Sequence, residues 1–324
     1  MNAMSSRTLG ISAALTATIL WGMQFPVLGA VLHDLDPFWL TFVRYLTATL
    51  ILAAVVLLRE GRGAFSLEGR GWTVAGLGIL GFSVFNVALL LGIRISGPQH
   101  GSLIMATTPL LVVLVGWLRG GAKPTVRTLG VIALAFFGVA LVVTKGNPAS
   151  VLAAGDWIGD LLMLGGALCW ATYTSWIPAF SSWSPLRYTM LGTFFGTLST
   201  AVIALVATMF GFSHLPRVGG FVHALPGMAF LAIAGAVISL VAWNIGIAKL
   251  GAPTAVLFMN VVPITAFAIA IGFGARYPAI EYVGAAITIF ALVLNNIVAR
   301  PRMRPVLAAV EGDRSAFDHQ CGVA

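Results

Sequence analysis

Charged side chains are scarce in this chain of 324 residues: they make up 9% of it, whereas hydrophobic residues make up 59%. A water-soluble domain keeps about 25% of its residues charged, so most of this surface must face a medium other than water. Windows of about 20 apolar residues recur, each long enough to cross the ~30 Å hydrocarbon core of a bilayer as a helix. Because these runs lack the alternation of barrel strands, the chain is predicted to be an all-α membrane protein.

Cysteine is also scarce: Cys169 falls inside an apolar run and Cys321 in a polar tail, so no structural disulfide is expected. The enzyme motifs G-x-S-x-G, H-E-x-x-H and C-x-x-C are missing, as is the phosphate-binding loop of ATP-driven pumps. Neither the charged ring nor the carbonyl filter sequence of a channel is present. We therefore predict that the chain is not an enzyme and that it holds no cofactor and no metal.

Carboxylates are missing from the middle of the apolar runs. Asp160 and Glu281 come closest, each about one turn inside the end of a run. Proton-driven pumps use carboxylates at mid-membrane depth, so uniport down a gradient is the simplest mechanism. The alternative is proton coupling through His100, a candidate proton or gate residue that we interpret first as an interfacial side chain.

Ten apolar segments, joined by short connections with Gly and Pro turn signals, are predicted to span the membrane. They lie near residues 8–31, 37–58, 72–95, 98–118, 126–145, 156–180, 185–211, 224–249, 252–273 and 279–299. With a cytoplasmic N-terminus, thirteen of the 18 basic residues fall in cytoplasmic segments, four fall on the opposite side, and Arg44 lies within a span. This bias predicts a multi-pass inner-membrane protein with both termini in the cytoplasm. The same distribution assigns the net charge of +8 to lipid headgroups and not to nucleic acid.

An internal repeat organises the chain. A shift of 154 residues superimposes Ala75–Phe136 on Ala229–Phe290 without a gap, with fifteen identities in 62 positions where about five or six are expected by chance. A looser match pairs Trp21 with Trp170 and Pro37 with Pro185. We predict a first five-helix repeat over 1–148, a second over 149–300 and a polar cytoplasmic tail over 301–324. Five spans per half invert the second half, as in secondary transporters whose site lies between their halves.

Short motifs mark several spans. They are Leu20-Trp21-Gly22 with Phe25-Pro26, Pro37 with Arg44-Tyr45, Gly97 with Pro109, and Gly251 with Pro263. With the repeat, they make residues 8–300 resemble the drug/metabolite transporter superfamily, in its ten-helix branch of EamA-type exporters. Within that family the chain is most similar to amino-acid exporters, including the aromatic amino-acid exporter (YddG) type.

Polar and aromatic side chains inside the spans are the candidate substrate-binding residues, because indole rings can form aromatic walls and amides can pair with amino and carboxylate groups. They are Trp21, Gln24, Arg44, Tyr45, Asn86, Met105, Trp170, Tyr173, Trp243, Asn244, Met259 and Asn260. Trp176 is grouped with the deep tryptophans. Packing between helices is the alternative for each of them. Arg44 is either a functional residue, as a counter-charge for a substrate carboxylate or a gate latch, or a side chain that reaches back to Asp34 or Asp36.

Two prolines within spans are candidate hinges. Pro109 and Pro263 are equivalent in the repeat, and each lacks the N–H that would bond the carbonyl of Met105 or Met259. A local bend at equivalent depth in both halves would suit a central cavity lined by spans 1, 3, 4, 6, 8 and 9.

These observations predict a secondary transporter that works by alternating access between two inverted repeats. The resemblance implies that it exports amino acids and related small metabolites, including neutral and aromatic amino acids. Proton-coupled efflux of drugs or metabolites and a channel are the alternatives. The expected partners are this small-molecule substrate and membrane lipid, and the chain is expected to act as a monomer.

Overall fold

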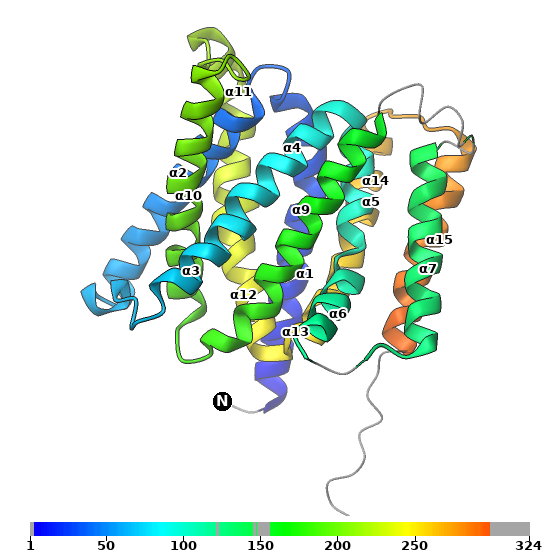
Figure 1. Cartoon of the computed structure of the whole chain (residues 1–324), viewed down its shortest axis with the longest axis horizontal. Helices are drawn as coiled ribbons and strands as arrows, with labels where there is room; N and C mark the ends of the chain where they lie inside the picture. Colours follow the sequence, from blue (N-terminus) through cyan, green and yellow to red (C-terminus); the bar gives the residue numbers. More distant parts are fainter. Residues whose placement is uncertain (1–2, 121–122, 145–146, 148–155, 299–324) are drawn as a thin grey trace, which may run out of the picture.

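Helices form all of the regular structure in the described part of the chain. The computed structural model describes residues 3–120, 123–144, 147 and 156–298, so the predicted tail over 301–324 lies outside the described residues. Six unbroken helices stand roughly side by side (Figure 1). They are α1 (Ala3–Val31), α2 (Pro37–Arg59), α7 (Val126–Thr144), α9 (Asp156–Trp176), α10 (Pro185–Met209) and α15 (Ala279–Val298).

The other segments each consist of two or three consecutive helical elements. The third is α3 (Gly71–Gly78), the π-helix η2 (Ile79–Val84) and α4 (Phe85–Ser96); the eighth is α11 (Val218–Ala232), the π-helix η4 (Ile233–Ile238) and α12 (Ser239–Leu250). The fourth is α5 (Pro98–Ala106) and α6 (Thr108–Leu118); the ninth is α13 (Ala252–Ala255), the 3-10 helix η5 (Val256–Asn260) and α14 (Val261–Gly272). Short 3-10 helices η1 (Arg62–Phe65) and η3 (Ile177–Phe180) lie in connections.

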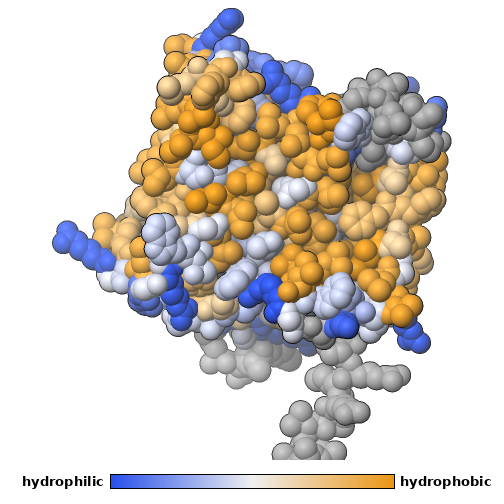
Figure 2. Space-filling model, viewed as in Figure 1, coloured by the Kyte–Doolittle hydropathy of each residue, from blue (hydrophilic) through white to orange (hydrophobic). Residues whose placement is uncertain are grey.

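Length and composition suit a bilayer. Among the described residues, five helices are each long and apolar enough to cross a membrane, or six if α5 and α6, bent by 42°, count as one span. Shorter apolar helices cover Val126–Val142, Val256–Gly272 and Ala279–Ala291. Figure 2 shows a broad apolar band across one face, with hydrophilic residues gathered along its upper and lower edges. The predicted all-α membrane architecture is confirmed, and the described residues form ten helical segments.

The internal repeat is visible in the geometry. The π-helices η2 and η4 lie 154 residues apart, residue for residue. Gly97 and Gly251, also 154 residues apart, end equivalent helices with φ angles of 92° and 79°, a backbone region that favours glycine. Irregularities that recur at the same offset confirm two repeats of one five-helix unit.

The two halves are interleaved. Helix α1 packs along α12 and α9 along α4, while α2 packs on α10 and α7 on α15. Each of these pairs joins one half to the other, so the core of the molecule is the interface between the halves. We call the end where α1 begins the proximal end and the end of the α1–α2 turn the distal end; the last helix, α15, runs back to the proximal end (Figure 1).

Each of the two candidate hinge prolines lies beside a change in helix geometry. The fourth segment breaks at Thr107, and Pro109 lies in the first turn of α6. The ninth changes from a 3-10 helix to an α-helix after Asn260, and Pro263 lies in the first turn of α14. α5 and α6 are bent by 42° at the break at Thr107, so the predicted bend near Pro109 is present. Each proline lies in a first turn, where its missing N–H leaves no hydrogen bond unmade.

Candidate substrate cavity

A cavity lies in the core between the two halves. The side chains around it are Trp21, Gln24, Phe25, Arg44, Tyr45, Phe85, Asn86, Leu89, Met105, Trp170, Leu240, Met259 and Val262. Eight of the twelve predicted binding residues are among them. Its free space is about 30 Å³, roughly the share of one water molecule in the liquid. Ligand pockets usually measure about 300–1,000 Å³, so the cavity is closed around its own side chains in this conformation.

Arg44 is the cation of the cavity, and it is 3% exposed. Its Nε donates to the Leu231 carbonyl at 3.1 Å, and its Nη2 donates to the Gly235 carbonyl at 2.9 Å and to Gln24 Oε1 at 2.7 Å. Gly235 lies in the π-helix η4 and Leu231 lies in the last turn of α11 just before it, where the regular i−4 bonding is interrupted. The alternative in which Arg44 reaches back to Asp34 or Asp36 is wrong, because the backbone of the opposite half supplies its acceptors.

Arg44 has no carboxylate partner among the described residues: the ion pairs found there involve other side chains. Its guanidinium lies 5.1 Å from the ring centre of Tyr45, a cation–π distance. The three hydrogen bonds use Nε and Nη2, which leaves Nη1 for a ligand. A buried guanidinium that is held by neutral acceptors keeps its positive charge uncompensated, which favours an anionic group in the cavity.

Aromatic rings form the walls. Trp21 meets Trp170 with ring centroids 5.4 Å apart, and Phe85 lies 5.3 Å from Trp170 on another side. Trp243 does not line the cavity but packs against Trp21 at 5.1 Å, and Tyr173 stacks behind Trp170 at 5.2 Å. These two predicted residues therefore support the walls from behind.

Four buried polar atoms near the cavity have no hydrogen-bond partner among the described residues. They are Nε1 of Trp170 and of Trp243, Oδ1 of Asn244 and Oδ1 of Asn260. Asn244 and Asn260 do not line the cavity; the Asn244 amide donates to the hydroxyls of Thr189 and Tyr173 instead. Asn86 does line it, and its Nδ2 donates to the Phe82 carbonyl at 3.1 Å, which leaves its Oδ1 as an acceptor. Trp170 Nε1 and Asn86 Oδ1 are thus a donor and an acceptor available to a substrate.

Some lining residues were not predicted. Phe25, Phe85, Leu89, Leu240 and Val262 complete the walls. An apolar side chain in an apolar span has no sequence signal that separates the cavity face from the lipid face. The second span also lines the cavity, in addition to the six spans that were predicted. Pro109 and Pro263 do not line it, whereas their neighbours Met105 and Met259 do.

His100 lies outside the cavity, in a buried pair. Its Nδ1 is 2.9 Å from Asp160 Oδ1, and the two residues are 5% and 8% exposed. His100 lies in the first turn of α5, and helix α9 of the other half covers it. Asp160 Oδ2 has no partner in the described part of the chain. The pair ties α5 to α9 across the interface between the halves.

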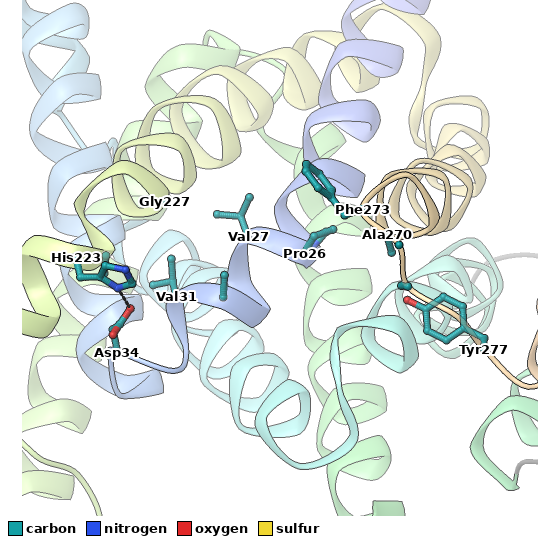
Figure 3. A pocket seen from close by; sticks show the side chains of 13 residues that line it. Pro26, Val27, Val31, Asp34, His223, Gly227, Ala270, Phe273 and Tyr277 are labelled. Carbon is teal, nitrogen blue, oxygen red and sulfur yellow. Dashed lines mark hydrogen bonds and ion pairs between the residues drawn. The ribbon is translucent and has the colours of Figure 1, made fainter.

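A wider vestibule opens at the distal end. It measures about 670 Å³ and lies between α1, α11, α14 and the connection after α14. In Figure 3, Pro26, Val27 and Val31 of α1 line its middle, the bonded pair Asp34 and His223 lies at one side, and Phe273 and Tyr277 lie at the other. It is large enough for a small metabolite.

A smaller space of about 40 Å³ lies between vestibule and cavity. It shares Pro26 and Ala270 with the vestibule and Phe25 with the cavity. Phe25 is 2% exposed, so its ring is the barrier that separates the two hollows on this side.

Known proteins resemble the chain along most of its length. The profile of the EamA-like transporter family matches it twice, over residues 8–144 and 157–297. The chain belongs to the EamA-like transporter family. The Bacillus subtilis (strain 168) protein named "Uncharacterized transporter YrdR" is 34% identical over 296 residues, which cover 90% of this chain and 92% of that protein. "Uncharacterized inner membrane transporter YedA" of Escherichia coli (strain K12) is 25% identical over 299 residues, which cover 89% and 92%.

A solved crystal structure supports the fold of this EamA-like transporter. It superimposes with a TM-score of 0.65 at 20% identity, covering 92% of this chain and 99% of that one. The family assignment makes the protein a membrane-embedded transporter. Neither relative's name states a substrate.

Proposed function

We propose that this EamA-like transporter exports amino acids and related small metabolites, including neutral and aromatic amino acids, across the inner membrane. Transport proceeds by alternating access, with the cavity between the halves as the binding site. Both halves of that site come from one chain, so a monomer is sufficient. Both termini face the cytoplasm, which places the distal vestibule outside; a reporter fusion that locates the C-terminus outside would contradict this orientation.

The observation that carries the proposal is the pairing of one uncompensated cation with aromatic walls. Arg44 offers Nη1 to a carboxylate, and charge-assisted hydrogen bonds to guanidinium are among the strongest in proteins. Trp21 and Trp170 flank the same space and suit an apolar or aromatic side chain. Asn86 Oδ1 can accept from an α-amino group. A quaternary ammonium compound, in contrast, would bring a second positive charge beside Arg44.

Energy coupling follows from the groups in the cavity. None of the residues that line it is a carboxylate, so uniport is the simplest form of this transport. Proton-coupled efflux is the second candidate, and the buried pair His100 and Asp160 favours it. A channel is less well supported, because a space of about 30 Å³ closed by Phe25 offers no continuous pore.

The test uses the full chain in proteoliposomes. We expect labelled phenylalanine and leucine to be transported, and phenethylamine, which lacks only the carboxylate of phenylalanine, to compete at least about tenfold more weakly. Because all ligands meet the same wild-type protein, this comparison does not depend on a variant that folds. Transport of quaternary ammonium drugs without any amino acid would overturn the proposal.

Arg44→Gln gives the matching residue test. We expect it to remove the discrimination between phenylalanine and phenethylamine. Arg94→Gln is the control, since Arg94 is 59% exposed at the distal end and pairs with Asp36 outside the cavity. Arg94→Gln should keep the discrimination; if it abolishes it as well, the effect is not specific to the cavity.

A further inference from the structure

The inverted repeats give each feature of the distal vestibule a counterpart at the proximal end. Helices α1 and α9 are aligned by the sequence shift that pairs Trp21 with Trp170. Under the same shift Val27 corresponds to Trp176. At the ends of α6 and α14 the offset is 154, so Arg119 corresponds to Phe273. Val27 and Phe273 line the open vestibule. Their counterparts Trp176 and Arg119 therefore mark the equivalent space at the proximal end, which we call the proximal gap.

At the proximal end this gap is closed by Arg119. Its guanidinium carbon lies 3.9 Å from the ring centre of Trp176, and its Nη1 donates to the Ser175 carbonyl at 2.9 Å. Trp176 was predicted to lie deep in its span. The structure instead places it at the proximal end, where it covers the gap. Arg119 belongs to the first half and Trp176 to the second, so the contact holds the halves together.

A second arginine closes the same gap one turn further along. Arg70 Nη1 donates to the Ala179 carbonyl at 2.9 Å, and its guanidinium carbon lies 5.6 Å from the ring centre of Phe180. The distal counterpart of Arg70 is Ala224, which lines the vestibule. An alanine cannot bridge the gap that the arginine bridges.

Aromatic rings in contact fill the path beneath the two arginines. From the cavity wall at Trp170 the contacts run through Tyr173 and Tyr188 to Phe180, with centroid distances of 5.2, 5.4 and 4.9 Å. Thr174, the counterpart of the barrier residue Phe25, is fully buried in this region. The proximal path is therefore packed, whereas the distal path holds a vestibule.

We propose that Arg70 and Arg119 form the proximal gate of the transport path. Each stacks on an aromatic ring and donates to a carbonyl in the last turns of α9 and η3, and together they hold this conformation with its proximal side shut. In the alternate conformation these contacts break, and the proximal gap opens as the distal vestibule narrows. The gate rests on the alternating access of the proposed function, but not on the identity of the substrate.

The test measures cysteine labelling without any substrate, in lipid nanodiscs that expose both ends. In a background without Cys169 and Cys321, Thr174→Cys reports the proximal side and Ala270→Cys, at the vestibule, reports the distal side. We expect a hydrophilic maleimide to react quickly with Ala270→Cys and slowly with Thr174→Cys. Adding Arg70→Gln and Arg119→Gln should raise the rate at Thr174→Cys on the order of tenfold and lower the rate at Ala270→Cys.

Opposite changes at the two reporters identify a gate, since a loosened structure would raise both rates. Arg59→Gln is the matched control, because Arg59 is an exposed arginine at the same end, on the last turn of α2; it should change neither rate. An unchanged rate at Thr174→Cys in the double variant, or a rise at both reporters, overturns the gate. Amino-acid transport plays no part in this readout, so its failure would be a separate result.

Discussion

The indole rings of Trp21 and Trp170 meet edge to face at the interface of the two halves, with centroids 5.4 Å apart and planes at 90°. The residues are counterparts in the repeat, one on α1 and one on α9. They are 7% and 2% exposed. A symmetric pair at the interface joins the halves and forms a wall of the cavity, so its loss should affect both stability and binding.

Trp170→Ala tests this double role. We expect it to lower the free energy of unfolding by about 3–5 kcal/mol, as truncation of a buried Trp usually does, and to weaken binding of aromatic amino acids. Trp170→Phe should keep part of both. Thermal unfolding in detergent and ligand titration measure the effects. Trp72→Ala is the control, since Trp72 is 94% exposed at the proximal end; an equal loss there would contradict a specific role.

Three glycines differ in how much room their surroundings leave for a Cβ atom. A Cβ on Gly81 would lie 2.7 Å from Tyr173 Cγ, one on Gly235 would lie 3.0 Å from Gln24 Oε1, and one on Gly76 would meet open space. Gly81→Ala should therefore destabilise by about 1–3 kcal/mol, whereas Gly76→Ala should be neutral or stabilise by up to about 1 kcal/mol. Gly235→Ala should mainly weaken ligand binding, because it displaces the acceptor of Arg44. Thermal unfolding and binding measured on all three check the order.

Much of the cavity could be predicted because polar residues stand out in apolar spans. Arg44, Gln24 and Asn86 are polar residues with few polar neighbours in the sequence, and the structure brings them together around the cavity. Phe25 and Leu240 line the same cavity without such a signal. Hydrophobic periodicity separates faces only where one face is polar, and a span surrounded by lipid and protein is apolar on both.

The partners of Arg44 could not be predicted. Its carbonyl acceptors lie 187 and 191 residues away in sequence, at a π-helix for which the chain shows no distinguishing pattern. The repeat, in contrast, paired Pro109 with Pro263 as equivalent positions, and η2 and η4 coincide under the same shift. The partner of His100 was missed for a related reason: Asp160 lies near the end of its span in sequence, and only the packing of α5 on α9 buries it.

Loss of one partner of the pair His100 and Asp160 should lower the free energy of unfolding strongly, whereas replacement of both partners by apolar residues should lower it little. Removal of one partner leaves the other buried alone, at a cost of about 3–5 kcal/mol. We expect Asp160→Leu or His100→Leu to destabilise strongly and the double variant to recover most of the loss, as measured by thermal unfolding. If transport is proton-coupled through this pair, the double variant also loses the pH dependence of the wild-type transport rate. A double variant as unstable as the sum of the single ones would contradict a coupled pair.

Glu68, in the connection before α3, gives the proximal end an acid-sensitive contact. A hydrogen bond from Trp183 Nε1 at 2.7 Å and the neighbouring Arg187 at 2.8 Å hold the pKa of Glu68 below its usual value of 4.5. The stabilisation is therefore present above that value and is lost as the pH falls through the lowered pKa. At pH 7 we expect the wild type to have a higher melting temperature than Glu68→Gln. Below pH 4.5 the difference between the two melting temperatures should shrink. A difference that is constant with pH would contradict the contact.

Pro109 lies where a continuous helix would need its missing N–H. The Met105 carbonyl, four residues earlier, accepts from Thr108 Oγ at 2.5 Å instead, and the Ile104 carbonyl accepts from the Thr107 hydroxyl at 2.7 Å. Side chains thus satisfy the carbonyls at the break. The bend can change without breaking a backbone hydrogen bond at Pro109, which is the property that a hinge requires.

Pro109→Ala should restore the backbone bond to Met105 and straighten the junction of α5 and α6. We expect transport to fall several-fold while ligand binding at the cavity survives, because Met105 lines the cavity but Pro109 does not. Pro263→Ala should act in the same direction through its counterpart Met259. Proteoliposome uptake and ligand titration on the same preparations separate rate from binding. If both variants transport at the wild-type rate while folded and inserted, the two prolines only begin helices, and the breaks at Thr107 and Asn260 do not move during transport.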